Sequence, residues 1–291
     1  MTQMLRFAPA KLNLFLHLTG KRTDGYHLLD SLVVFLDVAD RLTIAPGDAL
    51  SLTVNGAFAE AAGDVSQNLV LRAARALQQA TGATRGAALH LEKHIPVGAG
   101  LGGGSSDAAA ALLGLNDHWQ LGLDAPALAA IAAPLGADVP MCLAGISARV
   151  GGIGEVIAPL AEPLPALPLL LAHPRLPLST PDVYRAVTPA DIGGEAAVDI
   201  TQRFTTTQAL AAILASTRND LTAPACRVQP AVAHVLAALA APSPTLVRMS
   251  GSGACCFALY PHAAERDAAV AGLQASHPEW WVAAANLRSS G

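Results

Sequence analysis

Residues 96–107 read Pro-Val-Gly-Ala-Gly-Leu-Gly-Gly-Gly-Ser-Ser-Asp, and this stretch decides how the chain is interpreted. Before it, Leu89 and Leu91 alternate with polar residues, which predicts a strand; after it, a helix is predicted from Ser105 to about Trp119. Glycines permit positive φ and a close approach of the backbone, so that several N–H groups can point at one anion. The helix adds free N–H groups and its positive dipole end. The pattern therefore predicts a phosphate-binding loop.

Residues 96–107 match the other known glycine motifs, namely the dinucleotide-binding, P-loop and nucleophile-elbow patterns, less well. Gly98, Gly100 and Gly103 satisfy G-x-G-x-x-G, but a dinucleotide fold also needs an acid at the end of the next strand. Asp124 has the spacing and is expected to cap a helix instead. No Gly-Lys-[Ser/Thr] follows the loop, and no candidate serine has the flanking glycines of a nucleophile elbow. A helix start made flexible by chance is disfavoured, because five glycines cost much backbone entropy.

Composition narrows the class of protein. The chain has 291 residues, of which 52% are hydrophobic and 14% charged, which excludes disorder and leaves room for about two domains. A net charge of −4 and 4% aromatic residues argue against a nucleic-acid or anionic-membrane partner. We see no transmembrane segment or signal peptide and expect a cytoplasmic protein. The four cysteines form no CxxC pair and are expected to be small buried hydrophobes, and the histidines lack metal-ligand spacing.

Residues 10–18 form a predicted strand with two different faces. Its leucines share one face, whereas Lys11 and Asn13 lie on a mixed polar face and are expected to project away from the core. Because strands and helices do not alternate regularly, we predict an α+β fold in two domains, 1–158 and 159–291, joined at the Pro/Ala/Leu stretch 159–168. Further strands are expected at 28–38, 41–45, 50–54, 167–172, 245–249, 254–260 and 280–286, and helices at 68–80, from Asp124 to before Gly136, from Thr180, and at 205–216, 229–241 and 262–275.

Four more stretches add to the loop: Ala8-Pro-Ala-Lys-Leu-Asn-Leu14, Asp24-Gly-Tyr-His27, Leu135-Gly-Ala-Asp-Val-Pro140 and Met249-Ser-Gly-Ser-Gly253. Together they resemble the GHMP kinases, in particular the bacterial and plastid members that act on 4-diphosphocytidyl-2-C-methyl-D-erythritol. The resemblance covers nearly the whole chain in the right order. It implies ATP-dependent phosphorylation of the 2-hydroxyl of that compound, in the non-mevalonate route to isoprenoids. The implied fold is an N-terminal domain like ribosomal protein S5 domain 2 and a ferredoxin-like C-terminal domain, with the site in the cleft between them.

The resemblance also implies catalytic and nucleotide-binding residues. Asp138 would accept the hydroxyl proton, and Lys11 beside it would keep the carboxylate ionised and polarise the hydroxyl or steady the phosphoryl group. Read from the residues alone, Asp138 is also a plausible helix N-cap and Lys11 an ordinary surface lysine. Mg²⁺ is expected mainly on the ATP phosphates, and no protein metal ligand is predicted. The residues assigned to ATP are Asn68, Pro96, Val97, Gly98, Ala99, Gly100, Leu101, Gly102, Gly103, Gly104, Ser105 and Ser106.

Residues for the small-molecule substrate follow from the same resemblance. Tyr26 and His27 would meet the cytosine base, with Tyr184 on its opposite side. Asn13 would bind substrate hydroxyls or orient the lysine. Gly251, Ser252, Gly253 and Thr180 are also assigned to the substrate. Each has a plainer interpretation: an aromatic residue covering a sheet edge, a tight hairpin, or a helix cap before Pro181. Asn219-Asp220-Leu221 matches the family pattern without an evident role.

Two other functions stay open at this point. One is a different GHMP kinase of the homoserine or mevalonate type, which the Asp-Gly-Tyr-His stretch disfavours. The other is an inactive nucleotide-binding regulator on the same fold, which the presence of both Lys11 and Asp138 disfavours. We expect a monomer or a homodimer.

Overall fold

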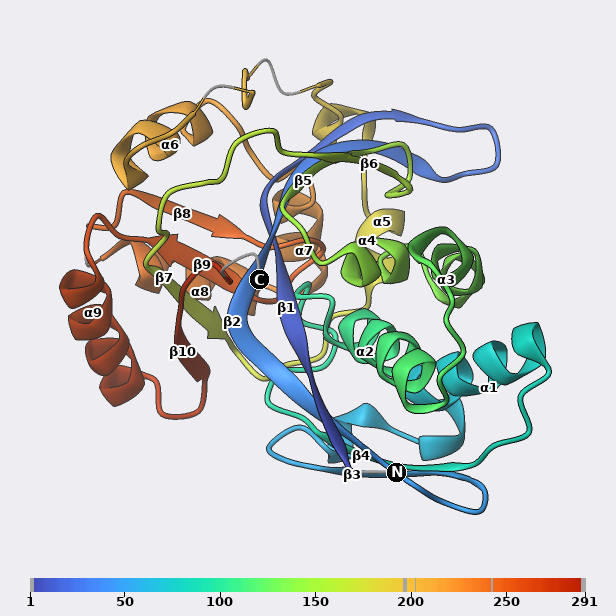
Figure 1. Cartoon of the computed structure of the whole chain (residues 1–291). Helices are drawn as coiled ribbons and strands as arrows, with labels where there is room; N and C mark the ends of the chain where they lie inside the picture. Colours follow the sequence, from blue (N-terminus) through green and yellow to red (C-terminus); the bar gives the residue numbers. More distant parts are fainter. Residues whose placement is uncertain (1–2, 196–197, 202, 242, 289–291) are drawn as a thin grey trace. The chain divides into compact units, whose positions relative to one another are not determined.

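A computed structural model describes residues 3–195, 198–201, 203–241 and 243–288 (Figure 1). The chain divides into two compact units, which are described separately. The first consists of Met1–Lys11, Val38–Val97 and Gly102–Gly145, and the second of Leu12–Asp37, Gly98–Leu101 and Ile146–Gly291. The long paired strands β1 (Met4–Lys21) and β2 (His27–Ala45) contribute residues to both. The domain boundary expected after residue 158 stays a prediction.

The first unit packs helices on a small sheet. In the sheet, β3 (Leu50–Asn55) runs parallel to β4 (Ala87–Glu92), which pairs antiparallel with the end of β2. Three helices, α1 (Leu69–Thr81), α3 (Ala125–Ala132) and α4 (Val139–Ala144), pack around α2 (Gly103–His118). Short 3₁₀ turns lie at Glu60–Ala62, Val65–Gln67 and Ala133–Leu135. Leu42, Ile44, Leu77, Leu112 and Trp119 are among the buried side chains of this core.

The second unit is built on an antiparallel sheet with strand order β10-β7-β9-β8. Its strands are β7 (Leu169–His173), β8 (Leu246–Met249), β9 (Cys256–Leu259) and β10 (Trp281–Ala285), and the helices α8 (Ala231–Ala240) and α9 (Ala263–Ser276) pack on them. This order is the one expected for a ferredoxin-like domain. A hairpin of β5 (Ala148–Gly151) and β6 (Val156–Pro159) pairs with residues 31–33 of β2. The remaining helices are α5 (Thr180–Arg185), α6 (Thr207–Leu214), α7 (Thr222–Val228) and a 3₁₀ turn at Pro189–Asp191.

Most predicted elements are present, and their capping residues explain where they begin. The Asn68 side chain accepts from the N–H of Val70 at the start of α1, and Asp124 accepts from Ala127 at the start of α3. The α+β class is confirmed. The strands at 28–38 and 41–45 are in fact one strand, because Asp40 between them is buried and its carboxylate finds partners there. Helix α7 and the β5–β6 hairpin were not predicted.

The plainer interpretation of Lys11 as a surface lysine is not supported, because the middle of β1 is buried. Both faces of its middle section are buried: Lys11 is 6% exposed, Asn13 4% and His17 1%. The apolar-polar alternation identified the strand, but it did not reveal that the polar face is also covered. A buried lysine needs a partner, because an ammonium group without one is costly to remove from water.

Burial of His173 at the end of β7 gives the stability a pH dependence. Its Nδ1 accepts from the N–H of Arg175 at 3.0 Å, so the folded ring is neutral. Burial, and then the charge of Arg175, lowers the pKa of His173 to about 4. The unfolded chain binds this proton near pH 6.5, so stability is fully present above that pH and is lost as pH falls towards 4, by up to about 3 kcal/mol.

We therefore predict that His173→Asn flattens the pH dependence of unfolding. Asparagine keeps an acceptor for the N–H of Arg175 but does not titrate. Urea unfolding at pH 4.5 and pH 7.0 measures the effect. The wild type should lose clearly more stability between the two pH values than the variant does, and an equal loss in both proteins would contradict the assignment.

Candidate active site

Lys11 and Asp138 form an ion pair in the first unit. Lys11 Nζ lies 3.2 Å from Asp138 Oδ2, and the lysine side chain is buried whereas that of Asp138 is 47% exposed. Asp138 precedes α4, but its side chain makes no hydrogen bond to the helix start, so the N-cap interpretation is not supported. The arrangement presents a carboxylate to solvent with a cation fixed behind it.

The helix α2 begins beside this pair. Gly102, at its N-cap, has φ +64°, and a Cβ there would lie 3.2 Å from Cβ and Cε of Lys11. The first turn therefore has no side-chain cap, and its N–H groups remain available for an anion. Ser105 is half-buried in this turn, whereas Ser106 is buried and its hydroxyl donates to the carbonyl of Pro9 at 2.6 Å.

A buried ionic cluster lies under the same helix start. Lys93 Nζ donates to Asp40 and, at 2.7 Å, to Asp107 Oδ2, and all three side chains are buried. Asp40 Oδ1 also accepts from the N–H groups of His94 at 2.6 Å and Ile95 at 2.8 Å. Asp107 Oδ1 is buried without a hydrogen-bond partner. Two carboxylates thus share one ammonium group.

Burial and the neighbouring charges change the pKa values of Asp107 and Lys93. Burial raises the pKa of Asp107 to about 7, although the Lys93 charge opposes that shift. Burial acts to lower the pKa of Lys93, but the carboxylates of Asp107 and Asp40 outweigh it and raise that pKa. A Cβ at Gly103 would lie 3.4 Å from Lys93 Nζ, so the ammonium group sits against the loop itself. We conclude that the cluster anchors the start of α2.

The first part of the glycine loop, residues 98–101, packs within the second unit against the turn 250–253. Gly100 has φ +72°, and a Cβ there would lie 2.2 Å from the carbonyl oxygen of Ser250. Ser250 Oγ donates to the carbonyl of Gly100 at 3.0 Å, and Cys255 N–H donates to that of Ala99 at 3.0 Å. The two glycine-rich segments that the sequence singled out are therefore hydrogen-bonded to each other. Pro96, which precedes them, is buried, and Val97 is exposed.

Asn13 contacts this turn through its backbone. Its N–H donates to Ser250 Oγ at 3.1 Å, while its side-chain amide donates to Ser31 Oγ at 2.7 Å. Ser31 in turn donates to the carbonyl of Phe15 at 2.5 Å. Asn13 is thus held in one orientation by a neighbour that the sequence did not identify.

Thr180 contacts the same turn through Ser252, and it is not a helix cap. Its hydroxyl lies 2.7 Å from that of Ser252. The cap of α5 is Ser179, whose hydroxyl accepts from the N–H of Asp182. The structure therefore removes the plainer interpretation of Thr180 and places it beside a residue assigned to the substrate.

Aromatic rings from distant parts of the second unit meet at His27 and Tyr184. Their centroids are 5.6 Å apart with the rings tilted by 30°. Burial, and then the charge of Lys21, lowers the pKa of His27, so its ring is neutral at neutral pH. Tyr26 is 60% exposed. His27 is therefore in ring contact with Tyr184, and the ring of Tyr26 is largely open to solvent.

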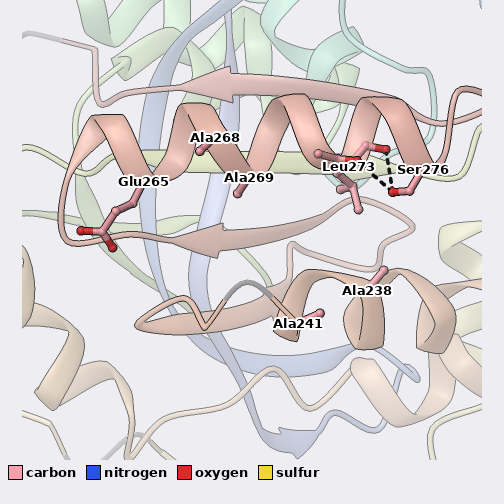
Figure 2. A pocket seen from close by; sticks show the side chains of 8 residues that line it. Ala238, Ala241, Glu265, Ala268, Ala269, Leu273 and Ser276 are labelled. Atoms are coloured by element: carbon pink, nitrogen blue, oxygen red, sulfur yellow. Dashed lines mark hydrogen bonds between the residues drawn. The ribbon is translucent and has the colours of Figure 1, made fainter.

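A groove of about 490 Å³ also lies in the second unit, between α8 and α9 (Figure 2). None of the predicted site residues lines it. Small side chains dominate its wall, and the charged group there is the carboxylate of Glu265, which is unsuited to phosphate. It is lined by Ala238, Ala241, Glu265, Ala268, Ala269, Gly272, Leu273 and Ser276.

The metal-ligating side chains and thiols of the described residues do not form a site of their own. No group of three metal-ligating side chains occurs among the residues that the structure describes. The cysteines form no disulfide, and burial raises the pKa of Cys142 to about 12, which excludes a thiolate nucleophile there. Within the described ranges, no helix combines the length and apolar character needed to cross a bilayer.

Comparison with known proteins identifies the family of the chain. Residues 68–146 match the family model of the GHMP kinases N terminal domain, and residues 200–279 that of the GHMP kinases C terminal. A crystal structure of 4-(cytidine 5'-diphospho)-2C-methyl-D-erythritol kinase superposes with a TM-score of 0.82 at 37% identity, covering 99% of this chain and 100% of the other. The crystal structure of a homoserine kinase from Cytophaga hutchinsonii superposes with a TM-score of 0.67 at 18% identity, covering 99% of this chain and 96% of the other. At this identity the match shows the fold alone.

The chain therefore belongs to the GHMP kinases. Within that class it falls in the family of the 4-diphosphocytidyl-2-C-methyl-D-erythritol kinases. The protein of that name from Paramagnetospirillum magneticum is 51% identical over 99% of this chain and its own full length. A protein of the same name from Cereibacter sphaeroides is 49% identical over 97% of this chain and 98% of its own length. Membership makes the chain an ATP-dependent kinase.

Proposed function

We propose that the chain transfers the γ-phosphoryl group of ATP to the 2-hydroxyl of 4-diphosphocytidyl-2-C-methyl-D-erythritol. The observation that carries the proposal is the Lys11–Asp138 pair, with a buried ammonium 3.2 Å from a half-exposed carboxylate. Phosphorylation of a hydroxyl group needs a base for the hydroxyl proton and a cation beside the transferred phosphoryl group, which are the roles proposed for Asp138 and Lys11. The names of relatives that are about half identical over nearly the whole chain supply the particular substrate.

In the proposed reaction Asp138 is the general base. The substrate oxygen forms a bond to the γ-phosphorus as the bond from that phosphorus to the bridging oxygen of ADP breaks, and the hydroxyl proton passes to the Asp138 carboxylate. The ammonium group of Lys11 and the N–H groups at the start of α2 stabilise negative charge on the transferred group. Asn68 and the loop residues 96–106 are proposed to hold the nucleotide.

Mg²⁺ is proposed to bind mainly through the ATP phosphates. Asp107 is buried against Lys93, and Asp138 is paired with Lys11, so the chain near the loop has few free oxygen ligands. Such a set suits Mg²⁺, which keeps several waters and phosphate oxygens. When bound, the ion neutralises charge on the phosphates. We add to the proposal that the protein acts in the cytoplasm on a small molecule rather than on a nucleic acid.

The second unit is proposed to hold the cytidine diphosphate part of the substrate. The glycine turn is hydrogen-bonded to Asn13 and Thr180, so these polar groups lie close together and are suited to bind a diphosphate. The turn residues concerned are Gly251, Ser252 and Gly253. The paired rings of His27 and Tyr184, together with the exposed ring of Tyr26, suit a pyrimidine base. A neutral His27 can offer its ring nitrogens to the edge of the base.

We predict that Tyr184→Ala raises the KM for the cytidyl substrate about tenfold, which corresponds to about 1.4 kcal/mol and to the loss of one stacked ring. The KM for ATP should change less than twofold. Trp280→Ala provides a control, because Trp280 stacks on His277 at 3.9 Å without any assigned ligand. Steady-state kinetics with each substrate varied in turn gives both constants. Equal effects of the two variants would contradict a specific role of Tyr184.

A substrate panel tests the proposed function. ADP release is measured with ATP and Mg²⁺ and, in separate reactions, the cytidyl diphosphate substrate, homoserine and mevalonate. We expect turnover with the first alone. Turnover with homoserine or mevalonate instead would make the chain a different kinase of the class, and ATP binding without turnover on any of them would favour a regulator.

A further inference from the structure

We propose that Asn219 is a positioning residue that fixes the glycine turn 250–253 in the shape required for the substrate. The inference deepens the proposed function and rests on it. The Asn219-Asp220-Leu221 motif stood out in the sequence, and neither the fold nor the proposed chemistry has so far given it a role.

All hydrogen-bonding groups of the Asn219 side chain are used, and two of them hold the turn. The side chain is 7% exposed, and its amide nitrogen donates to the carbonyls of Met249 and Gly251, each at 2.8 Å. Its Oδ1 accepts from the N–H of Leu221 at 3.0 Å. An asparagine side chain has two N–H donors, and both point at the turn.

The backbone on both sides of Asn219 is hydrogen-bonded to β1. Leu16 N–H donates to the carbonyl of Arg218 at 3.0 Å, and the N–H of Asp220 donates to the carbonyl of Leu16 at 2.8 Å. The Asp220 carboxylate accepts from Leu18 N–H at 2.7 Å and from Arg218 Nε at 2.5 Å. Asn219 is thus a short, rigid link between a strand and the turn.

Arg248, just before the turn, strengthens the same link. Its guanidinium donates to the carbonyls of Leu14 at 2.7 Å, Leu214 at 3.0 Å and Thr217 at 2.7 Å, and to the Thr217 hydroxyl at 2.8 Å. Burial lowers the pKa of Arg248 to about 10, so it stays charged at neutral pH. Arg248 thus holds the residues before Asn219, and the hydrogen bonds of Asp220 to β1 hold the residue after it.

Holding the carbonyls also orients the N–H groups that follow them. A trans peptide is planar, so its C=O and N–H point in opposite directions. With the Met249 carbonyl turned to Asn219, the N–H of Ser250 points the other way and donates to Cys255 at 2.9 Å. With the Gly251 carbonyl turned to Asn219, the N–H of Ser252 is directed away from Asn219. This N–H is the group that would bind an oxygen of the substrate diphosphate.

The test compares Asn219→Ala with Asn116→Ala. Asn116 is similarly buried and makes the same kind of clamp, since its amide donates to the carbonyl of Leu123 at 3.1 Å and accepts from Leu123 N–H at 3.0 Å. It lies in the first unit, at the far end of α2 from the loop. We expect both variants to lose stability, and only Asn219→Ala to raise the KM for the cytidyl substrate by about tenfold, with a smaller change in kcat.

Hydrogen exchange without substrate gives an independent readout. The amides of residues 250–255 should exchange at least tenfold faster in Asn219→Ala and be unchanged in Asn116→Ala. Asn219→Asp keeps the acceptor for Leu221 but turns an anion towards two carbonyls, and it should raise the KM at least as much as alanine does. Normal wild-type turnover with an unchanged KM in Asn219→Ala overturns this inference alone. A wild type that does not use the cytidyl substrate overturns the proposed function together with it, and the exchange rates still decide whether the clamp exists.

Discussion

Asp138→Asn is expected to lower kcat by about 10²–10⁴-fold, the usual worth of a general base. Asparagine has the same shape and cannot accept the hydroxyl proton. Because the Asp138 side chain is half-exposed and does not cap α4, the variant should fold and bind ATP as the wild type does. Single-turnover kinetics together with ATP titration separates loss of chemistry from loss of binding.

The control for this variant is Asp124→Asn. Asp124 also precedes a helix of the first unit, but its carboxylate caps that helix through the N–H of Ala127 at 2.9 Å. Its replacement should leave kcat within twofold of the wild type. A kcat for Asp138→Asn within tenfold of the wild-type value would show that Asp138 is not the base.

Lys93→Met is expected to cause the largest loss of stability. The substitution keeps much of the volume but leaves the buried carboxylates of Asp40 and Asp107 without their cation. Removal of one partner from a buried ionic group costs about 3–5 kcal/mol, which is a large share of the stability of a typical domain. Urea unfolding monitored by circular dichroism measures the free energy of unfolding.

Two further variants make this result decisive even if Lys93→Met does not fold. Asp107→Asn should cost clearly less than Lys93→Met at pH 7, because burial raises the pKa of Asp107 and so reduces the charge that the substitution removes, and because Asp40 keeps its cation. Arg41→Met removes an exposed pair with Glu92 and should cost less than about 1 kcal/mol. Equal stabilities for Lys93→Met and Arg41→Met would contradict the buried cluster.

The sequence predicted correctly those features that depend only on residues close together in the chain. Asn68 and Asp124 were identified as helix starts because a cap needs only neighbouring residues. The glycine loop was placed between a strand and a helix for the same reason. The pairing of Lys11 with Asp138 was inferred from a resemblance, since 127 residues separate them and no periodicity relates them; their positions in the structure agree with it.

Contacts between distant residues were beyond such reasoning. Lys93 follows Glu92 and precedes His94, which resembles a solvated charged strand end, and only the fold brings Asp40 and Asp107 to it. One available signal was Asp40, which lies between the two predicted strands 28–38 and 41–45. Asn219 illustrates the same limit, because its motif was visible but its partners Met249 and Gly251 lie about 30 residues further along the chain.

The most direct test of the central claim is the structure of the product. The wild-type protein is incubated with ATP, Mg²⁺ and 4-diphosphocytidyl-2-C-methyl-D-erythritol, and the product is examined by phosphorus and carbon NMR. We predict one new phosphomonoester signal, with phosphorus coupling to the carbon that bears the 2-hydroxyl, while the diphosphate signals are retained. Phosphorylation at another hydroxyl, or no new phosphomonoester with folded protein and intact ATP binding, would contradict the account.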